Sequence, residues 1–380
     1  MMKFKANWIA LTAVCLVAAC GGGGGDIKPQ ANINSVKVVG DSLSDSGTFG
    51  YKFTVQGAAA TGAGSSQVWP ERIATSYSQT MCNHYASSNG VTFSANASCN
   101  NYAVAGSRIN HLTAPNSPSS VLQQLQDLGG GGFVPGDLVL VGGGANDAAD
   151  LIGAYLRAAT DGGASYVAVL RTVLDTATVN AALAGGSAGL AAAGNSYMKA
   201  LAGRYEASIQ AQALDKGAPR LAVLNIPDIT VTPRFRLVIA SISARNGAAA
   251  AAQSQALFKS WIESFNNDLS TRFAADKRVA VVDFYSFIVD NATNPASYAL
   301  TNVKDASCPA TGVDADGLPT YSFPTCTAAS LGATPPPAGA AGGADWWKSY
   351  GFSDSFHPTP FGHQLVSQLV ARSLAQAGWL

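Results

Sequence analysis

The sequence predicts an α/β fold, a three-layer α/β/α sandwich built on a mainly parallel sheet of about five strands. Two observations lead to this class. Short apolar runs bounded by turn residues recur along the chain, as expected of buried strands. Segments with helical spacing lie between them, and this alternation is typical of parallel sheets. The predicted strands cover residues 35–40, 137–142, 220–226 and 279–284.

Three segments between and after these strands carry apolar residues at helical spacing. They cover residues 190–214, 256–273 and 361–374. In the second segment Trp261, Phe265 and Leu269 are four residues apart and would form one buried stripe. We expect the last segment to pack on the sheet through Leu365, Val366, Leu369, Val370 and Leu374.

The chain shows no charged linker that would divide it into two folding units. We therefore expect one domain over residues 35–380, with a small separate cap domain as the alternative. Two stretches of biased composition resemble insertions of loop structure. These are the alanine-rich residues 177–194 and the residues 307–344, which are rich in proline, glycine and alanine.

Composition excludes one class of partner. The formal net charge is +0 and only 12% of the residues are charged, against roughly 25% in average globular chains. A basic surface for nucleic acid is therefore not expected. We expect a monomer.

The first nineteen residues predict an export signal. Lys3 and Lys5 precede an apolar stretch, residues 8–19, that is too short to span a bilayer. The stretch ends in Leu-Val-Ala-Ala directly before Cys20, which resembles the lipobox of bacterial lipoproteins. We therefore expect residues 1–19 to be removed, Cys20 to carry a lipid anchor, and residues 20–34 to form a glycine-rich tether. An ordinary secretory signal is the alternative, and both place the protein at the outer membrane, in the periplasm or outside a bacterial cell.

Four further cysteines remain after removal of the signal, and an oxidising compartment favours disulfides between them. Of the three possible connectivities, pairing of neighbours in the sequence closes the shortest loops and costs the least entropy. The predicted pairs are Cys82 with Cys99 and Cys308 with Cys326. Metal binding is disfavoured because the chain has no C-x-x-C or H-x-x-x-H spacing.

Candidate catalytic residues come from opposite ends of the chain. Ser42 follows the first predicted strand, and ligands of open α/β sheets bind at the carboxyl ends of strands. A serine hydroxyl needs a base to remove its proton and a carboxylate to orient that base. Asp354 and His357 stand three residues apart in the predicted loop before the last helix, a spacing that permits a carboxylate–imidazole contact. Alone, this D-x-x-H spacing is also compatible with a solvated loop histidine.

Four ordered blocks carry a family resemblance. In chain order the blocks are Gly-Asp-Ser-Leu-Ser-Asp-Ser-Gly, Asn-Tyr-Ala-Val-Ala-Gly, Gly-Ala-Asn-Asp and Asp-Ser-Phe-His-Pro. Together they resemble the GDSL or SGNH hydrolases, a group of esterases, lipases and acyltransferases. The blocks begin at residues 40, 101, 144 and 354, so the resemblance spans nearly all of the mature chain. Residues 69–71 and 225–228 are similar to less specific segments of the same family.

The resemblance implies an SGNH-type, flavodoxin-like fold and a small-molecule or lipid ester as the substrate. It implies a Ser42–His357–Asp354 triad that forms an acyl-enzyme without metal or cofactor. It also implies that the oxyanion is held by the backbone N–H groups of Ser42 and Gly106 and by the side-chain amide of Asn146. Within the same fold, a phospholipase, an acyltransferase or a carbohydrate acetylesterase remains open. A surface lipoprotein without catalytic activity and a periplasmic binding protein are alternatives from other classes.

Several residues that resemble functional ones are expected to have structural roles. Asp41 and Asp147 are predicted to hold turns by hydrogen bonds to backbone N–H groups. The three remaining histidines are expected to serve surface or packing roles. Gly-Gly-Ser-Ala-Gly around Ser187 matches a G-x-S-x-G nucleophile motif, but it lacks a preceding buried strand and is interpreted as flexible loop.

Overall fold

The computed structural model describes residues 31–58 and 66–380, and its centre is a parallel sheet. Four strands pair in the order β1-β4-β5-β6. They are β1 (Ser35–Val39), β4 (Asp137–Val141), β5 (Leu221–Leu224) and β6 (Val279–Val282), and every pairing is parallel. Each strand lies within its predicted range, so the α/β class is confirmed.

The prediction of about five strands is corrected to four in this sheet. Residues 100–104 lie where a fifth strand would be, beside β1. The N–H of Val38 donates to the carbonyl of Asn100 (2.9 Å), and Tyr102 donates back to Val38 (2.8 Å). Only the isolated bridge between Val38 and Asn101 forms. The Asn101 side chain also donates to the carbonyl of Ser44 and to the hydroxyl of Ser46, which joins this segment to the turn after β1.

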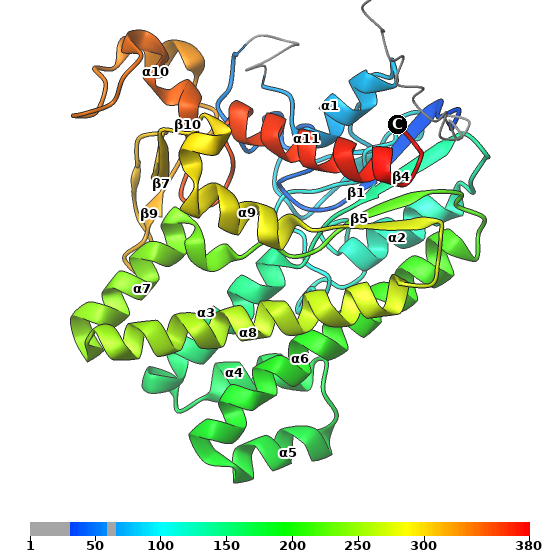
Figure 1. The fold of residues 1–380 in the computed structure, drawn as a ribbon. Coiled ribbons are helices and arrows are strands. Elements are labelled where there is room, and N and C mark those ends of the chain that lie inside the picture. The colour runs from blue at the N-terminus through cyan, green and yellow to red at the C-terminus, as the bar shows by residue number, and fades with distance from the viewer. Residues whose placement is uncertain (1–30, 59–65) are drawn as a thin grey trace, which may run out of the picture.

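Both faces of the sheet are buried, as the alternating direction of strand side chains requires. Val139, Val141 and Val223 point into one apolar cluster, whereas Leu138 and Leu140 point into the other. Helices complete each cluster, which gives the predicted three layers (Figure 1). One outer layer contains α1 (Trp69–Ser76), α9 (Phe284–Thr293) and α11 (Pro360–Gln376), and the other α2 (Val121–Gly130), α3 (Ala145–Asp161), α6 (Gly186–Ile209) and α8 (Ala248–Phe273).

Shorter elements surround these layers. The remaining helices are α4 (Ala164–Arg171), α5 (Thr176–Ala184), α7 (Pro233–Asn246) and α10 (Ala328–Ala333), with short turns η1 (Gln210–Leu214), η2 (Ile229–Val231), η3 (Pro295–Tyr298) and η4 (Gly343–Ser349). Small two-stranded ladders are formed by β2 (Tyr85–Ala86) with β3 (Ser94–Ala95), β7 (Asn302–Ala306) with β10 (Tyr350–Phe352), and β8 (Gly312–Val313) with β9 (Pro319–Thr320).

The three predicted helices are present. The first is α6 followed by the π-helical turn η1, and the other two lie within α8 and α11. Trp261, Phe265 and Leu269 form the buried stripe expected of α8. Trp261 packs so closely on α6 that a Cβ added at Gly194 would lie 2.2 Å from its ring. Glycine at this position therefore permits the two long helices to approach.

The interpretation of residues 177–194 as loop is wrong. This stretch forms α5 and the beginning of α6, joined at Gly185 into a helical hairpin. Alanine has the highest helix propensity, and the glycines here allow close packing rather than flexibility. A Cβ at Gly189 would lie 2.4 Å from the carbonyl oxygen of Ala182, so the two helices touch backbone to backbone.

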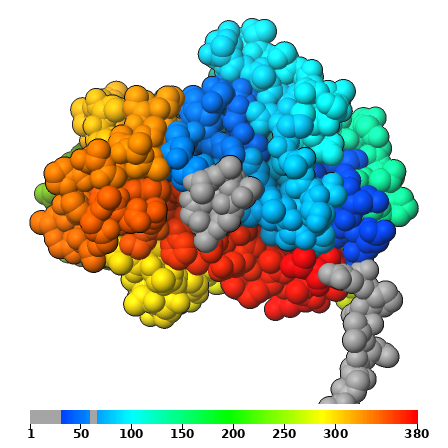
Figure 2. Space-filling view, turned by 90° about the horizontal axis from the view of Figure 1, so that it is seen from above, coloured from blue at the N-terminus to red at the C-terminus, as the bar shows by residue number. Residues whose placement is uncertain are grey.

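Residues 307–344 contain the β8–β9 hairpin and α10, and they pack beside the N-terminal part of the domain (Figure 2). Gln56 joins the two segments, since its N–H donates to Cys326 (2.9 Å) and its carbonyl accepts from Ala328 (2.8 Å). The predicted disulfides, Cys82–Cys99 and Cys308–Cys326, are both present.

The N-terminal predictions fall largely outside the described residues. Signal segment 1–19, Cys20 and most of the tether belong to residues 1–30, so their roles stay predictions. Within residues 31–58 and 66–380, no helix has both the length and the apolar character needed to cross a bilayer. The prediction of one domain also stays a prediction.

Candidate active site

Ser42 lies in the turn that leaves β1. The turn is closed by the N–H of Ser44, which donates to the carbonyl of Asp41 (3.0 Å), and by the N–H of Leu43, which donates to the Asp41 carboxylate (3.0 Å). Gly40 starts the turn, where a Cβ would meet the Ser44 hydroxyl at 3.0 Å. Ser42 is thereby held at the carboxyl end of the first strand with 5% of its surface exposed.

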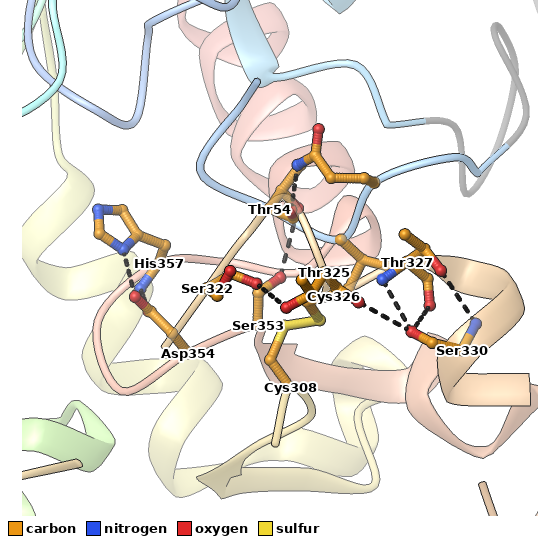
Figure 3. The surroundings of a disulfide bond; sticks show 12 residues. Thr54, Cys308, Ser322, Thr325, Cys326, Thr327, Ser330, Ser353, Asp354 and His357 are labelled. Atoms are coloured by element: carbon orange, nitrogen blue, oxygen red, sulfur yellow. Dashed lines mark hydrogen bonds and ion pairs between the residues drawn. A yellow bond between two sulfur atoms is a disulfide. The ribbon is translucent and has the colours of Figure 1, made fainter. Parts of the chain in front are cut away.

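Asp354 and His357 lie in the loop between β10 and α11. One Asp354 oxygen accepts the N–H groups of Phe356 (2.7 Å) and His357 (2.6 Å), and the other lies 2.8 Å from Nδ1 of His357. Burial raises the pKa of Asp354, but the neighbouring imidazole and these hydrogen bonds hold it below its ordinary value. The carboxylate therefore stays charged where it meets the imidazole (Figure 3).

The two halves of the predicted site meet. Nε2 of His357 lies 2.7 Å from Oγ of Ser42, although 315 residues separate them in the sequence. The hydrogen-bond pattern assigns Nδ1–H as donor to Asp354 and leaves Nε2 free to accept the serine hydroxyl. This arrangement can take a proton from Ser42 and return it to a leaving group.

Three aromatic side chains lie around the imidazole; Phe356 belongs to the predicted block that contains His357, whereas no sequence pattern indicated Phe53 or Phe323. The rings of Phe53, Phe323 and Phe356 have centroids 5.1, 5.5 and 5.9 Å from that of His357. With these neighbours, 13% of the His357 side chain is exposed. Phe323 belongs to the region closed by the Cys308–Cys326 disulfide, so this region contributes directly to the surroundings of the imidazole.

Gly106 and Asn146, the two further oxyanion candidates, lie on neighbouring segments. Gly106 has φ of +79°, a left-handed conformation that favours glycine. Asn146 is the second residue of α3, and its side-chain amide donates to the carbonyl of Ser107 (3.0 Å). The segment before Gly106 is joined to the serine turn by the N–H of Ala105, which donates to Asp45 (2.8 Å). One amide hydrogen of Asn146 is left for a ligand.

Arg108 supports this corner and was not predicted. Its guanidinium donates to the carbonyl of Gly106 and forms a salt bridge with Asp150 at 2.6 Å. The hydrogen bond to Asp150 raises the pKa of Arg108, so the group remains a cation. Through its hydrogen bond to the Gly106 carbonyl, the cation restrains the peptide bond between Gly106 and Ser107. No motif indicated the contact, because an arginine two residues after a glycine is ordinary in sequence.

The remaining acidic candidates behave as turn-holding residues. Asp147 accepts the N–H groups of Ile109 (2.9 Å) and Asn110 (2.7 Å), and burial raises its pKa to about 6. Burial also raises the pKa of Asp41.

The other histidines lie apart from the Ser42–His357 pair in their contacts. His84 stacks on Tyr102 at 3.9 Å, and Nδ1 of His111 accepts the N–H of Ala114 (3.0 Å). His363 is fully buried in α11, and burial lowers its pKa. Ser187 is exposed at the beginning of α6, with no strand before it. No cluster of three or more metal-binding side chains occurs in the described part of the chain.

Comparison with known proteins adds one match. A family model described as GDSL-like lipase/acylhydrolase matches residues 36–370. The match begins in β1 and ends within α11, so it includes every candidate catalytic and oxyanion residue. No curated protein matches the chain.

Proposed function

Because the chain belongs to the GDSL-like lipase/acylhydrolase family, we propose that it is an exported serine esterase or lipase that cleaves carboxylic esters. Ser42 is the nucleophile, His357 is the general base and acid, and Asp354 orients the imidazole. The observation that carries the proposal is the unbroken chain of contacts from Ser42 through His357 to Asp354, at 2.7 and 2.8 Å.

The proposed reaction has two halves. Oγ of Ser42 attacks the acyl carbonyl carbon while Nε2 of His357 accepts the hydroxyl proton. Collapse of the tetrahedral intermediate breaks the ester C–O bond, and His357 gives its proton to the departing alcohol. Water then attacks the acyl-enzyme, again deprotonated by His357, and the carboxylic acid leaves as the proton returns to Ser42.

Negative charge develops on the carbonyl oxygen in both halves. We assign its stabilisation to the N–H groups of Ser42 and Gly106 and to the free amide hydrogen of Asn146. Each preorganised donor of this kind contributes about 10²- to 10³-fold in rate. Arg108 acts through Gly106 as a positioning residue, because it binds the carbonyl of that glycine.

A comparison of two serine variants tests the proposal. Ser42→Ala should lower kcat/KM for p-nitrophenyl butyrate by at least about 10³-fold, the scale of nucleophile removal in serine hydrolases. Ser187→Ala is the matched control, because Ser187 is the exposed serine of the G-x-S-x-G match. It should retain the wild-type kcat/KM. Equal activity of wild type and Ser42→Ala would contradict the proposal and favour a non-catalytic surface protein.

Attachment to a membrane through Cys20 is proposed separately. Lipidation at the first residue after the signal would tether the catalytic domain through residues 20–34. Cys20→Ser should move the protein from the membrane fraction to the soluble fraction of cells. Continued fractionation of the variant with membranes would contradict an anchor at this residue.

A further inference from the structure

A small cavity lies at the carboxyl ends of the sheet strands, beside the turn that carries Ser42. We name it the strand-end cavity. Residues that follow each of the four strands line it: Asp41 and Ser44 after β1, Gly142 after β4, Asn225 after β5 and Phe284 after β6. Its water-accessible volume is about 20 Å³. A single water needs roughly 10–15 Å³, so the cavity has room for one water.

Trp69 lines the same cavity and brings a buried donor to it. It is the first residue of α1, and only 1% of its surface is exposed. The Nε1–H of its indole finds no hydrogen-bond acceptor in the described part of the chain. Buried N–H groups nearly always have a partner, because an unpaired one has lost its contact with solvent without compensation. An acceptor for this donor is therefore expected in the cavity.

The serine turn supplies two further groups with unused hydrogen-bonding capacity. Oδ1 of Asp41 accepts the N–H of Leu43 (3.0 Å), whereas Oδ2 accepts no hydrogen bond from another of the residues 31–58 and 66–380. The Ser44 hydroxyl has no hydrogen-bond partner among these residues either, and it lies 3.8 Å from the position of a Cβ added at Gly142. Asp41 and Ser44 are 4% and 2% exposed, so bulk solvent does not satisfy them.

The three groups complement one another around a single water. The indole N–H only donates, the carboxylate oxygen accepts, and the hydroxyl can do either. Buried waters make about three hydrogen bonds to polar groups of this kind. Burial raises the pKa of Asp41, and a water that donates to the carboxylate would offset part of this desolvation.

The residues after Trp69 hold the start of α1 in place. The Glu71 carboxylate accepts the N–H of Val68 (2.8 Å) and forms a salt bridge with Lys52 at 2.7 Å. Pro70 stands in the first turn of the helix, where proline is favoured. The Trp-Pro-Glu segment therefore presents the indole to the cavity from a restrained helix end.

We propose that one structural water occupies the strand-end cavity, accepting from Nε1–H of Trp69 and donating to Oδ2 of Asp41 and Oγ of Ser44. Through this water, Trp69 restrains the carboxylate that closes the turn around the nucleophile. Trp69 is then a positioning residue, since it acts on Ser42 through Asp41 and touches no reacting atom. Only this kinetic role rests on the proposed function.

A crystal structure of the wild-type protein, at a resolution that shows ordered water, tests the site without turnover. We expect one density peak within about 2.7–3.2 Å of Nε1 of Trp69, Oδ2 of Asp41 and Oγ of Ser44. The same peak should be lost or displaced in Trp69→Phe, which removes the donor. A cavity without density between these atoms, or an indole N–H that donates to a protein acceptor, would overturn the site.

Steady-state kinetics with p-nitrophenyl butyrate tests the positioning role. Trp69→Phe should lower kcat by about fivefold, the rate equivalent of one net hydrogen bond, and leave KM nearly unchanged, because a looser turn misplaces Oγ without weakening ground-state binding. Trp379→Phe is the matched control, since Trp379 belongs to the same apolar cluster but does not line the cavity. It should retain the wild-type kcat.

A double variant separates the shared water from two independent effects. Ser44→Ala should also lower kcat by about fivefold, and it carries the kinetic test if Trp69→Phe does not fold. Because both side chains act through one water, Trp69→Phe combined with Ser44→Ala should lose little more than either single variant. Multiplied losses in the double variant, unchanged kcat in the single variants, or an equal loss in Trp379→Phe would overturn the positioning role.

The outcomes for the water and for the esterase are distinguishable. Wild type that hydrolyses no ester would remove the esterase proposal and with it the positioning role, whereas water density between the three atoms would still support the site. An active wild type whose cavity holds no water would overturn the site and leave the esterase proposal standing.

Discussion

The hydroxyl of Thr54 donates a hydrogen bond to the carbonyl oxygen of Pro358 at 3.0 Å, and Pro358 is the residue directly after His357. Thr54 is fully buried and belongs to a loop near the N-terminus. The same carbonyl also accepts from the hydroxyl of Ser353 at 2.9 Å. Two separated segments thus fix the backbone on which the imidazole stands.

Thr54→Val tests the energetic weight of this contact. The substitution keeps the side-chain shape but removes the donor, and we expect the free energy of unfolding to fall by about 1 kcal/mol, the usual net value of one hydrogen bond. Urea unfolding measures the change. Thr75→Val is the control, because Thr75 is exposed and donates only within its own helix. Equal stability of Thr54→Val and wild type would show that Ser353 alone suffices.

Removal of a disulfide should separate stability from catalysis. The two disulfides join cysteines that are 17 and 18 residues apart in the sequence. Chain entropy therefore predicts that removing either one lowers the free energy of unfolding by about 3 kcal/mol. Cys308 also donates its N–H to Ser353 (2.7 Å), one residue before Asp354. Alanine keeps this N–H, but without the disulfide the backbone that carries it is less restrained. Replacement of Cys308 and Cys326 by alanine should therefore also lower kcat, whereas replacement of Cys82 and Cys99 should lower mainly the melting temperature. A similar fall of kcat in both variants would contradict a specific effect on the imidazole loop.

Asn146→Ala tests the proposed oxyanion donor. Loss of the amide should lower kcat by about 10²- to 10³-fold with little change in KM, because the interaction strengthens only in the transition state. Steady-state kinetics with p-nitrophenyl butyrate measures the split between kcat and KM. Asn267→Ala on the exposed face of α8 is the matched control. A change of KM alone would assign Asn146 to ground-state binding instead.

Asp147 should make the folded protein less stable as the pH rises. Burial raises its pKa to about 6 from 3.8, so the folded protein binds a proton more tightly than the unfolded chain does. The resulting stabilisation is complete below about pH 4 and is lost as pH rises through about 6, by as much as roughly 3 kcal/mol. Urea unfolding of wild type and Asp147→Asn at several pH values isolates the effect. If the difference between the two proteins did not vary over this range, Asp147 would not have a raised pKa.

The sequence predicted most of the sheet and the residues that meet at its edge. Strands β1 and β4 were recognised because their β-branched and apolar residues are bounded by turn residues on both sides. Ser42 and His357 were recognised because each lies in an ordered block next to a predicted strand or helix. Local patterns sufficed for these features, since the residues concerned carry chemistry that few other positions require.

The features that were missed depend on contacts between distant segments. Phe53 and Phe323 lie in loops without periodicity, so only the folded chain brings them against His357. The sequence predicts loop for the α5–α6 hairpin because its glycines indicate flexibility, whereas in the structure Gly189 permits close helix packing. At the fifth position of the sheet, the segment around Asn101 joins β1 through an isolated bridge, which strand propensity does not describe.

Covalent labelling of the nucleophile tests the central claim most directly. A fluorophosphonate reacts with a serine only where a base has activated the hydroxyl. Peptide mapping of the labelled wild-type protein by mass spectrometry should find the phosphonyl group on Ser42, with no label in Ser42→Ala and strongly reduced label in His357→Ala. Stoichiometric labelling of another residue, or unchanged labelling of Ser42→Ala, would contradict the assignment of Ser42 as the nucleophile.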